Sequence, residues 1–263
     1  MSYVDLYATL RDWPYEPEKI SVRKILSADD SIRVQMRVEL GVIQMESKGR
    51  PDGFRPHGCA TLLDYHKQRL AHYEASNATT LGFGLTPDEC EALRTEASLF
   101  YRRYIAFFVL EEYESVQRDT SHSLAIFDFC NDYAFEEEDR IALEEFRPYV
   151  RMMHARASAY RSMEEGEPAS ALAHVNRGIL DIRNFFEDAG HPEAFENSEE
   201  LKILKSLASD LNVQLPADSL ISTRRALRAA IEAERFEDAA RLRDELHDRY
   251  PDLTHPVSDT TTG

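Results

Sequence analysis

The side chains best able to do chemistry in this 263-residue chain are carboxylates that occur in adjacent pairs. These pairs are Glu111 with Glu112, Glu144 with Glu145, and Glu164 with Glu165. Two neighbouring carboxylates could share acid and base roles or bind a divalent cation. Each pair falls where a helix surface or a helix end is expected, and solvation explains charges in such places. We therefore predict no catalytic residue and no enzymatic activity.

Metal ligation is a second chemistry that the sequence could support, through His57, Cys59, His66 and His72. Cys59 and His66 stand two helical turns apart, too far for adjacent ligation on one helix. We interpret His66 and His72 as helix-surface residues. The chain has three cysteines and no C-x-x-C pair, so neither a zinc ribbon nor a disulfide framework is expected, and each cysteine is predicted to be a small buried side chain. We predict no metal and no cofactor.

Other catalytic patterns are missing from the sequence. A glycine-rich phosphate loop ending in Gly-Lys-Ser/Thr does not occur, nor do a serine nucleophile elbow and a His-Glu-x-x-His helix. Of the formal net charge of −17, most lies in residues 58–216, which hold 15 Lys and Arg against 29 Asp and Glu. A surface of that charge repels a phosphate backbone, so nucleic acid is not expected to bind there.

Composition indicates a globular chain, with 43% hydrophobic and 30% charged residues. The longest apolar run, Tyr104 to Leu110, is far too short to cross a membrane, and the N-terminus lacks the pattern of a secretion signal. We expect a cytoplasmic protein without membrane contact.

The residues most able to bind a partner lie near the C-terminus. Leu227 and Ile231 recur at helical spacing, and Ala239 and Leu242 do so again, with Phe236 between the two runs. Residues 217–250 are therefore predicted to form a helical hairpin, followed by a disordered tail over 251–263. Acidic residues after Phe236 suit the positive end of the second helix.

The run FEDAARLRDEL resembles the UVR motif, named for the UvrB and UvrC excision-repair proteins. In that family the motif is a helical hairpin that docks on another hairpin and recurs as a partner-binding module, so the resemblance implies binding and names no reaction. The expected apolar seam comprises Leu227, Ile231, Phe236, Ala239, Ala240 and Leu242, with Arg243 and Asp244 at its rim. The alternative is an ordinary terminal hairpin packed on its own domain.

Residues 1–57 are predicted to form an arm and an antiparallel β hairpin. Residues 32–40 alternate strictly between apolar and polar side chains, and a bend is expected at Gly41. The apolar face must lie on helices, because a lone hairpin is marginal in water. A tight turn is expected at 50–53. The pattern QMR…LG…QM…GRPDG…RPHG, from Gln35 to Gly58, is similar to a stretch in bacterial proteins that also end in a UVR motif.

A second candidate contact site is expected around the glycine- and proline-rich stretch at 49–58. It consists of Arg37, Arg50, Asp52, Arg55 and His57. A rigid loop that carries charged side chains is typical of a contact site. The alternative is a connector whose arginines bind local carbonyl groups.

Residues 58–216 are predicted to form an acidic α-helical domain. A capping box at Thr86 begins a long helix that is expected to continue to about Val116, and its aromatic residues are expected to form the centre of the core. Residues 157–172 look like a loose tetratricopeptide repeat. The predicted fold class is therefore mainly α, a repeat-like helical domain with a small β hairpin before it and a UVR-like hairpin after it.

These patterns favour a non-enzymatic adaptor that docks on a helical partner, or on a second copy of itself, through residues 217–250. The first alternative is an accessory protein of DNA repair that contacts DNA through its N-terminal region. The second alternative is an enzyme with an acidic site, which would need a concave pocket that gathers carboxylates from several helices.

Overall fold

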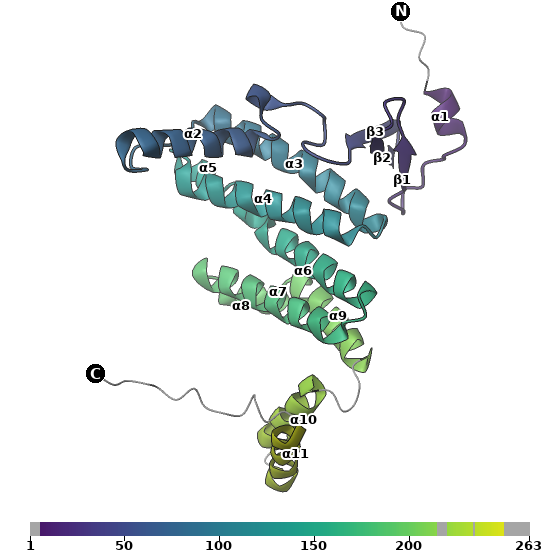
Figure 1. Ribbon diagram of the computed structural model, residues 1–263, viewed down its shortest axis with the longest axis vertical. Coiled ribbons are helices and arrows are strands. Elements are labelled where there is room, and N and C mark those ends of the chain that lie inside the picture. The colour runs from purple at the N-terminus through teal and green to yellow at the C-terminus, as the bar shows by residue number, and fades with distance from the viewer. Residues whose placement is uncertain (1–5, 215–219, 234, 250–263) are drawn as a thin grey trace, which may run out of the picture.

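The computed structural model describes residues 6–214, 220–233 and 235–249. Its order is α1 (Tyr7–Arg11), β1 (Val22–Leu26), β2 (Ile32–Val38), β3 (Gly41–Glu46), α2 (Leu62–Asn77), α3 (Pro87–Val109), α4 (Tyr113–Tyr133), α5 (Glu137–Ile141), α6 (Arg147–Glu164), α7 (Pro168–Asp188), α8 (Pro192–Asn197), α9 (Glu199–Gln214), α10 (Leu220–Glu232) and α11 (Phe236–Arg249). The fold is mainly helical, with a small antiparallel sheet near its N-terminus, as predicted (Figure 1). The disordered tail expected at 251–263 lies outside the described residues.

The sheet has three strands, so the expected hairpin is extended by one strand. Its order is β1-β2-β3, with Val22 opposite Met36 and Val34 opposite Met45. The chain turns fully at Glu39 and Leu40, which places Gly41 at the start of β3 and leaves Leu40 92% exposed. The expected bend at Gly41 is therefore a reversal one residue earlier, because Gly41 pairs directly with Val38.

One face of the sheet packs on helices, as the apolar alternation predicted. Val34 and Met45 are buried in the same cluster as Tyr104 and Phe107 of α3. The N-terminal arm contacts part of the other face: the indole of Trp13 donates to Ser21 Oγ at 2.6 Å, and the Arg23 guanidinium lies 4.1 Å from the centre of the indole ring. Trp13 therefore fixes the arm to the sheet.

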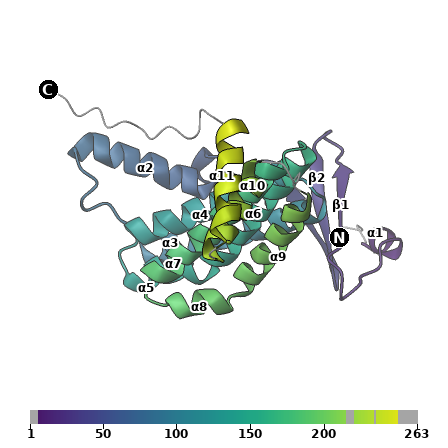
Figure 2. The same ribbon diagram turned by 90° about the horizontal axis from the view of Figure 1, so that it is seen from below.

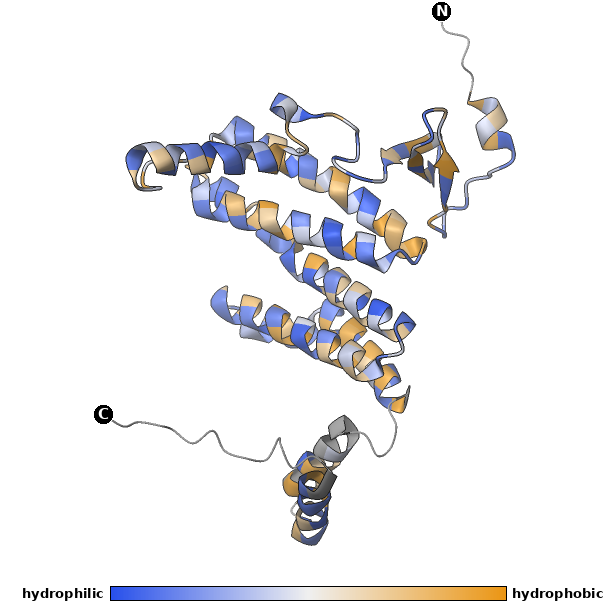
Figure 3. Ribbon diagram, in the orientation of Figure 1, coloured by the Kyte–Doolittle hydropathy of each residue, from blue (hydrophilic) through white to orange (hydrophobic). Residues whose placement is uncertain are grey.

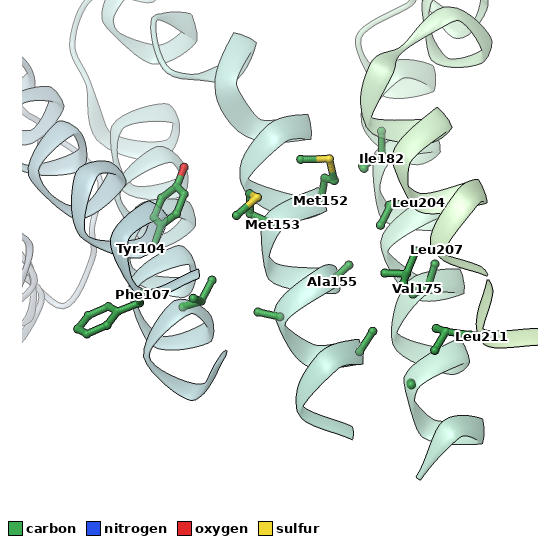
Figure 4. Close-up of a cluster of buried hydrophobic side chains, with 14 of the residues drawn as sticks. Tyr104, Phe107, Met152, Met153, Ala155, Val175, Ile182, Leu204, Leu207 and Leu211 are labelled. Atoms are coloured by element: carbon green, nitrogen blue, oxygen red, sulfur yellow. The ribbon is translucent and has the colours of Figure 1, made fainter. Parts of the chain in front are cut away.

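The long helices form successive packed neighbours, α3 with α4, α4 with α6, α6 with α7 and α7 with α9 (Figures 1 and 2). Hydrophobic and hydrophilic residues alternate in stripes along them in Figure 3. The larger core cluster joins the sheet to α3, α6, α7 and α9 through residues that include Tyr104, Met152, Val175 and Leu204 (Figure 4). A second cluster lies between α2, α3 and α4.

The capping box predicted at Thr86 is present. Thr86 Oγ1 accepts from the Glu89 N–H, and the Glu89 carboxylate accepts from the Thr86 N–H. The predicted extension of this helix to about Val116 is wrong, because α3 ends at Val109. Glu111 has a φ of 59°, and the Glu112 N–H donates to Phe107 O at 2.9 Å, which closes the helix end. Glycine usually occupies this left-handed position, and its absence left the break without a signal in the sequence.

A glycine with positive φ lies in the connection between α6 and α7, and another lies in the connection between α7 and α8. Gly166 and Gly190 have φ values of 77° and 76°, and Gly190 directly follows Ala189, the C-cap residue of α7. The repeat-like interpretation of residues 157–172 remains a prediction, although Ala157, Ala171 and Leu172 are all buried between α6 and its neighbours.

Candidate functional site

The C-terminal hairpin consists of α10 and α11 joined by a short turn. The Arg235 N–H donates to Ala230 O at 2.8 Å, and the Ala239 N–H donates to Arg235 O at 3.0 Å. Glu237 and Asp238 lie in the first turn of α11, where carboxylates favour the positive end of the helix. Within the described residues, α10 packs mainly against α11. In Figure 1 the hairpin lies beyond α9.

The contact between the two helices is made of small residues and one leucine. Ala230 and Ala239 are 1% and 7% exposed, and Thr223 and Leu246 are also buried. Alanines at the contact let the two backbones approach closely. Three of these four residues were not among the predicted seam residues. Thr223 and Ala230 are seven residues apart on α10, and Ala239 and Leu246 are seven residues apart on α11. This helical spacing is the signal that could have identified the buried contact.

The predicted seam divides into an inner and an outer part. Ala239 is covered by the hairpin itself, so its predicted role facing a partner is not supported by its burial. Leu227, Ala240 and Leu242 are half-buried. Ile231 and Phe236 are 54% and 68% exposed, and they stand near the turn, at the end of α10 and the start of α11. The outer surface of the hairpin therefore carries an exposed aliphatic and an exposed aromatic side chain.

The predicted rim residues lie on the exposed side of α11. Arg243 and Asp244 are paired with each other at 2.8 Å, with both side chains largely exposed. Such a pair contributes little to stability, because solvent screens the attraction. Their charges remain accessible to another molecule.

Comparison with known proteins supports the interpretation of this hairpin. Residues 218–247 match the UvrB/uvrC motif. The match covers the hairpin alone and leaves the sheet and the helices α2 to α9 outside it. No curated protein and no solved structure matches the chain. The UVR motif predicted from the sequence is thus confirmed at the positions expected.

The second candidate contact site is separated into three places. Arg50 forms ion pairs with Asp52 at 3.0 Å and with the buried Glu96 at 3.4 Å, and its side chain is 12% exposed. Glu96 also accepts from the Leu62 and Leu63 N–H groups, at 2.7 and 3.1 Å. Arg50 therefore ties the loop to Glu96 of α3, which also binds the first N–H groups of α2. The turn predicted at 50–53 is present, with the Gly53 N–H donating to Arg50 O at 2.9 Å.

Arg37 serves the sheet. Its guanidinium donates to Trp13 O at 2.8 Å, to Gly41 O at 2.9 Å and to Val38 O. These bonds hold the arm against the turn between β2 and β3. The guanidinium is therefore engaged with carbonyl groups of its own chain, as the alternative interpretation of the neighbouring arginines had expected.

Arg55 and His57 lie together at a surface pocket of about 670 Å³, with Cys59 and Lys67 also in its lining. Arg55 donates to Gly58 O at 3.2 Å, and the His57 ring stacks on Tyr65 with centroids 3.9 Å apart. Arg55 and His57 are exposed, as is Asp52, whereas Arg37 and Arg50 are half-buried. Cys59 is half-buried, so the expectation that every cysteine is buried holds only for Cys90 and Cys130.

The histidines considered as metal ligands do not share a site. His66 is 2% exposed, which makes its assignment to the helix surface wrong, whereas His72 is exposed as expected. The His66 ring lies beneath Tyr65 and Phe129, and its Nδ1 accepts from Arg69 at 2.9 Å. Burial lowers the pKa of His66. Among the described residues, no three side chains of His, Cys, Asp or Glu are grouped as metal ligands would be.

Two of the three acidic pairs meet at one place. Glu111 and Glu112, from the turn after α3, and Glu164 and Glu165, from the end of α6, line a pocket of about 400 Å³ together with Arg161. Glu112 is paired with Lys24 at 2.5 Å and Glu165 with Arg161 at 3.0 Å. The first ion pair links β1 to the end of α3, whereas the second lies within the last turn of α6. Glu144 is paired with Arg147.

The buried thiols are poor nucleophiles. Burial raises the pKa of Cys90 to about 11 and that of Cys130 to about 12, so both remain protonated at neutral pH.

None of the described helices has the length and hydropathy that a membrane crossing requires.

Proposed function

We propose that this protein is a non-enzymatic adaptor that binds a helical partner, or a second copy of itself, through its UVR hairpin. The observation that carries the proposal is the exposure of Ile231 and Phe236 on the segment that matches the motif. An aromatic residue beside an aliphatic one is the composition of an interface centre, and aromatic residues are enriched there. The exposed charges of Arg243 and Asp244 would fix the orientation of the partner.

The two helices contact each other through small side chains and Leu246, which leaves Ile231 and Phe236 exposed on the outside. Burial of Phe236 against a partner would remove apolar surface from water, worth roughly 25 cal/mol per Å². Self-association would be symmetric, with each hairpin offering the same surface to the other.

The test is affinity capture with the whole chain, with and without the pair Ile231→Ala and Phe236→Ala. Alanine favours helix, so the hairpin keeps its structure while its outer apolar surface is lost. The matched control is Val213→Ala, an 85% exposed apolar residue on α9. We expect the double variant to lose its captured proteins, or its dimer in sedimentation equilibrium, while the control keeps them. Unchanged binding by the double variant would refute the proposal.

The second candidate function is an accessory role in DNA repair, favoured by the name of the matched motif. Arg37 and Arg50 are engaged within the chain, so DNA contact would depend on Arg55 and its neighbours at the pocket beside His57. Binding of duplex DNA would weaken steeply with salt. A gel shift at low salt that detects no complex would eliminate this candidate.

A further inference from the structure

A cavity of about 510 Å³ lies between α3, α4, α9 and the start of α6, away from the UVR hairpin. Its volume falls within the range of small-molecule sites, roughly 300–1,000 Å³. The side chains that define it are Tyr101 and Tyr104 of α3, Phe146 and Tyr149 near the start of α6, and two carboxylates, Glu145 and Glu200. Figure 4 shows Tyr104 on the side of α3 that faces α6.

Aromatic rings surround this cavity at different orientations. Tyr101 and Tyr104 have ring centroids 5.4 Å apart and planes at 89°, and Tyr101 and Tyr149 have centroids 6.3 Å apart and planes at 56°. Tyr101 and Phe146 are 48% and 51% exposed, which is unusual for large aromatic side chains that border one cavity. The π faces of such rings are negative and attract a cation placed over them.

The charges at the cavity that lack a partner are negative. The carboxylates of Glu145 and Glu200 form no ion pair or hydrogen bond with another described residue. The cation in the lining, Arg94, donates to Asp139 at 2.6 Å and to Glu91 at 2.8 Å. Its charge is therefore neutralised within the chain. An anionic ligand would face two free carboxylates without a free cation to offset them.

A second observation places the Glu200 carboxylate close to the Tyr149 ring. Burial raises the pKa of Tyr149, and the neighbouring Tyr101 and the charge of Glu200 add to this increase, although Arg156 opposes it. Glu200 thus lies within electrostatic reach of the Tyr149 hydroxyl group.

We propose that this cavity binds an organic cation, an alkylammonium or alkylguanidinium group, between the rings of Tyr101, Phe146 and Tyr149 with Glu145 and Glu200 as counter-charges. Aromatic rings with nearby carboxylates recognise such groups because the rings favour a weakly hydrated charge and the carboxylates neutralise it. The site is independent of the UVR hairpin, so it stands whether or not the adaptor function does.

The first test compares choline with its neutral isostere 3,3-dimethyl-1-butanol, using isothermal titration calorimetry on the whole chain at low salt. The two molecules have the same shape and differ in charge. We expect choline to bind at least about threefold more tightly, the factor that corresponds to the weaker end of cation–π contacts. Equal binding of the two, or no detectable binding of either choline or butylguanidinium at millimolar concentration, would overturn the proposal.

The second test assigns the binding to these residues. Tyr101→Leu removes a π face from a half-exposed side chain, and Glu200→Gln removes one charge without changing size. We expect each to weaken binding of the cation by about three- to thirtyfold. Glu138→Gln, at an exposed carboxylate of α5 outside the cavity, is the matched control and should leave affinity unchanged. Equal effects of all three substitutions would overturn the assignment.

The source of the cation is resolved by comparing butylguanidinium with the capped tripeptide acetyl-Gly-Arg-Gly-amide. If the tripeptide binds as tightly, the cavity accepts an arginine side chain on a peptide. If the tripeptide is excluded and butylguanidinium binds, the ligand is a free small molecule. Both results support recognition of a cation.

Discussion

Several charged residues of α3 and α4 are buried and have structural roles. Glu96 lies at 0% exposure, where it accepts from two N–H groups of α2 and from His122 Nε2 at 3.1 Å. Arg103 and Asp119 form a fully buried ion pair at 2.7 Å, and Arg103 also donates to Glu46 O at 2.9 Å. Buried charges require such partners, because an unpaired charge in the interior is costly. These contacts connect the sheet, α2, α3 and α4.

The first prediction concerns the pH dependence that His66 contributes. Its pKa is lowered in the folded protein, chiefly by burial, from the ordinary value of 6.5. In the window between the lowered pKa and 6.5, the unfolded chain binds more protons than the folded chain. The stability that neutral His66 contributes is therefore present above about pH 6.5 and is lost as the pH falls below it.

We expect His66→Gln to reduce the dependence of the free energy of unfolding on pH between pH 7 and 5, measured by urea denaturation. The slope is reduced and not abolished, because burial also lowers the pKa of His154. The control is His72→Gln on the exposed side of the same helix, for which we expect an unchanged slope. Parallel curves for His66→Gln and the unmodified chain would contradict this prediction.

At the scale of elements, one close approach fixes how α6 and α7 pack. A Cβ atom at Gly178 of α7 would lie 2.5 Å from the Cβ of Ala155 on α6 and 3.5 Å from Leu204 Cδ1. The two helices are therefore in contact at the backbone, and glycine at this position provides the space. In the interior of a helix, glycine otherwise costs roughly 1 kcal/mol relative to alanine.

The second prediction follows from this contact. Gly178→Ala should lower the free energy of unfolding by about 1–3 kcal/mol, because overpacking outweighs the gain in helix propensity. Combining it with Ala155→Gly, which exchanges the two side chains, should recover most of the loss. Urea denaturation of the two single variants and the double variant measures the coupling. Strictly additive effects would show that the two positions do not contact each other.

At the scale of the whole molecule, the UVR hairpin packs chiefly on itself, while the helices α2 to α9 and the sheet share two continuous cores. Elements that make few contacts with one another can unfold separately. A change in the hairpin should therefore leave the larger core folded. The predicted boundary near residue 216 lies outside the described residues and remains a prediction.

The third prediction tests this separation. Ala239→Asp places a charge at the buried contact between α10 and α11, so the hairpin should unfold. Hydrogen exchange should then become fast in residues 220–249 and stay slow in α3, α4, α6 and α7. Ala233→Asp, the same change at an exposed position in the turn, should leave both regions protected. Loss of protection throughout the chain would show that the hairpin and the core unfold together.

The sequence by itself determined the local features of this protein. The capping box at Thr86, the turn at 50–53 and the UVR hairpin depend on residues close together in the chain, and their types and spacing were sufficient to predict them. The apolar alternation of residues 32–38 likewise predicted the face that packs on the helices. The proposed adaptor function rests on the same short segment.

Only the tertiary structure decided which polar residues are buried and which aromatic residues are left exposed. The pairing of Arg50 with Glu96 spans 46 residues, and the burial of His66 depends on rings from α2 and α4. The cavity beside Tyr101 likewise needs side chains from several helices, with Tyr149 and Glu200 distant from it in the chain. Burial depends on contacts between segments that the sequence separates, and no local pattern records which of those contacts form.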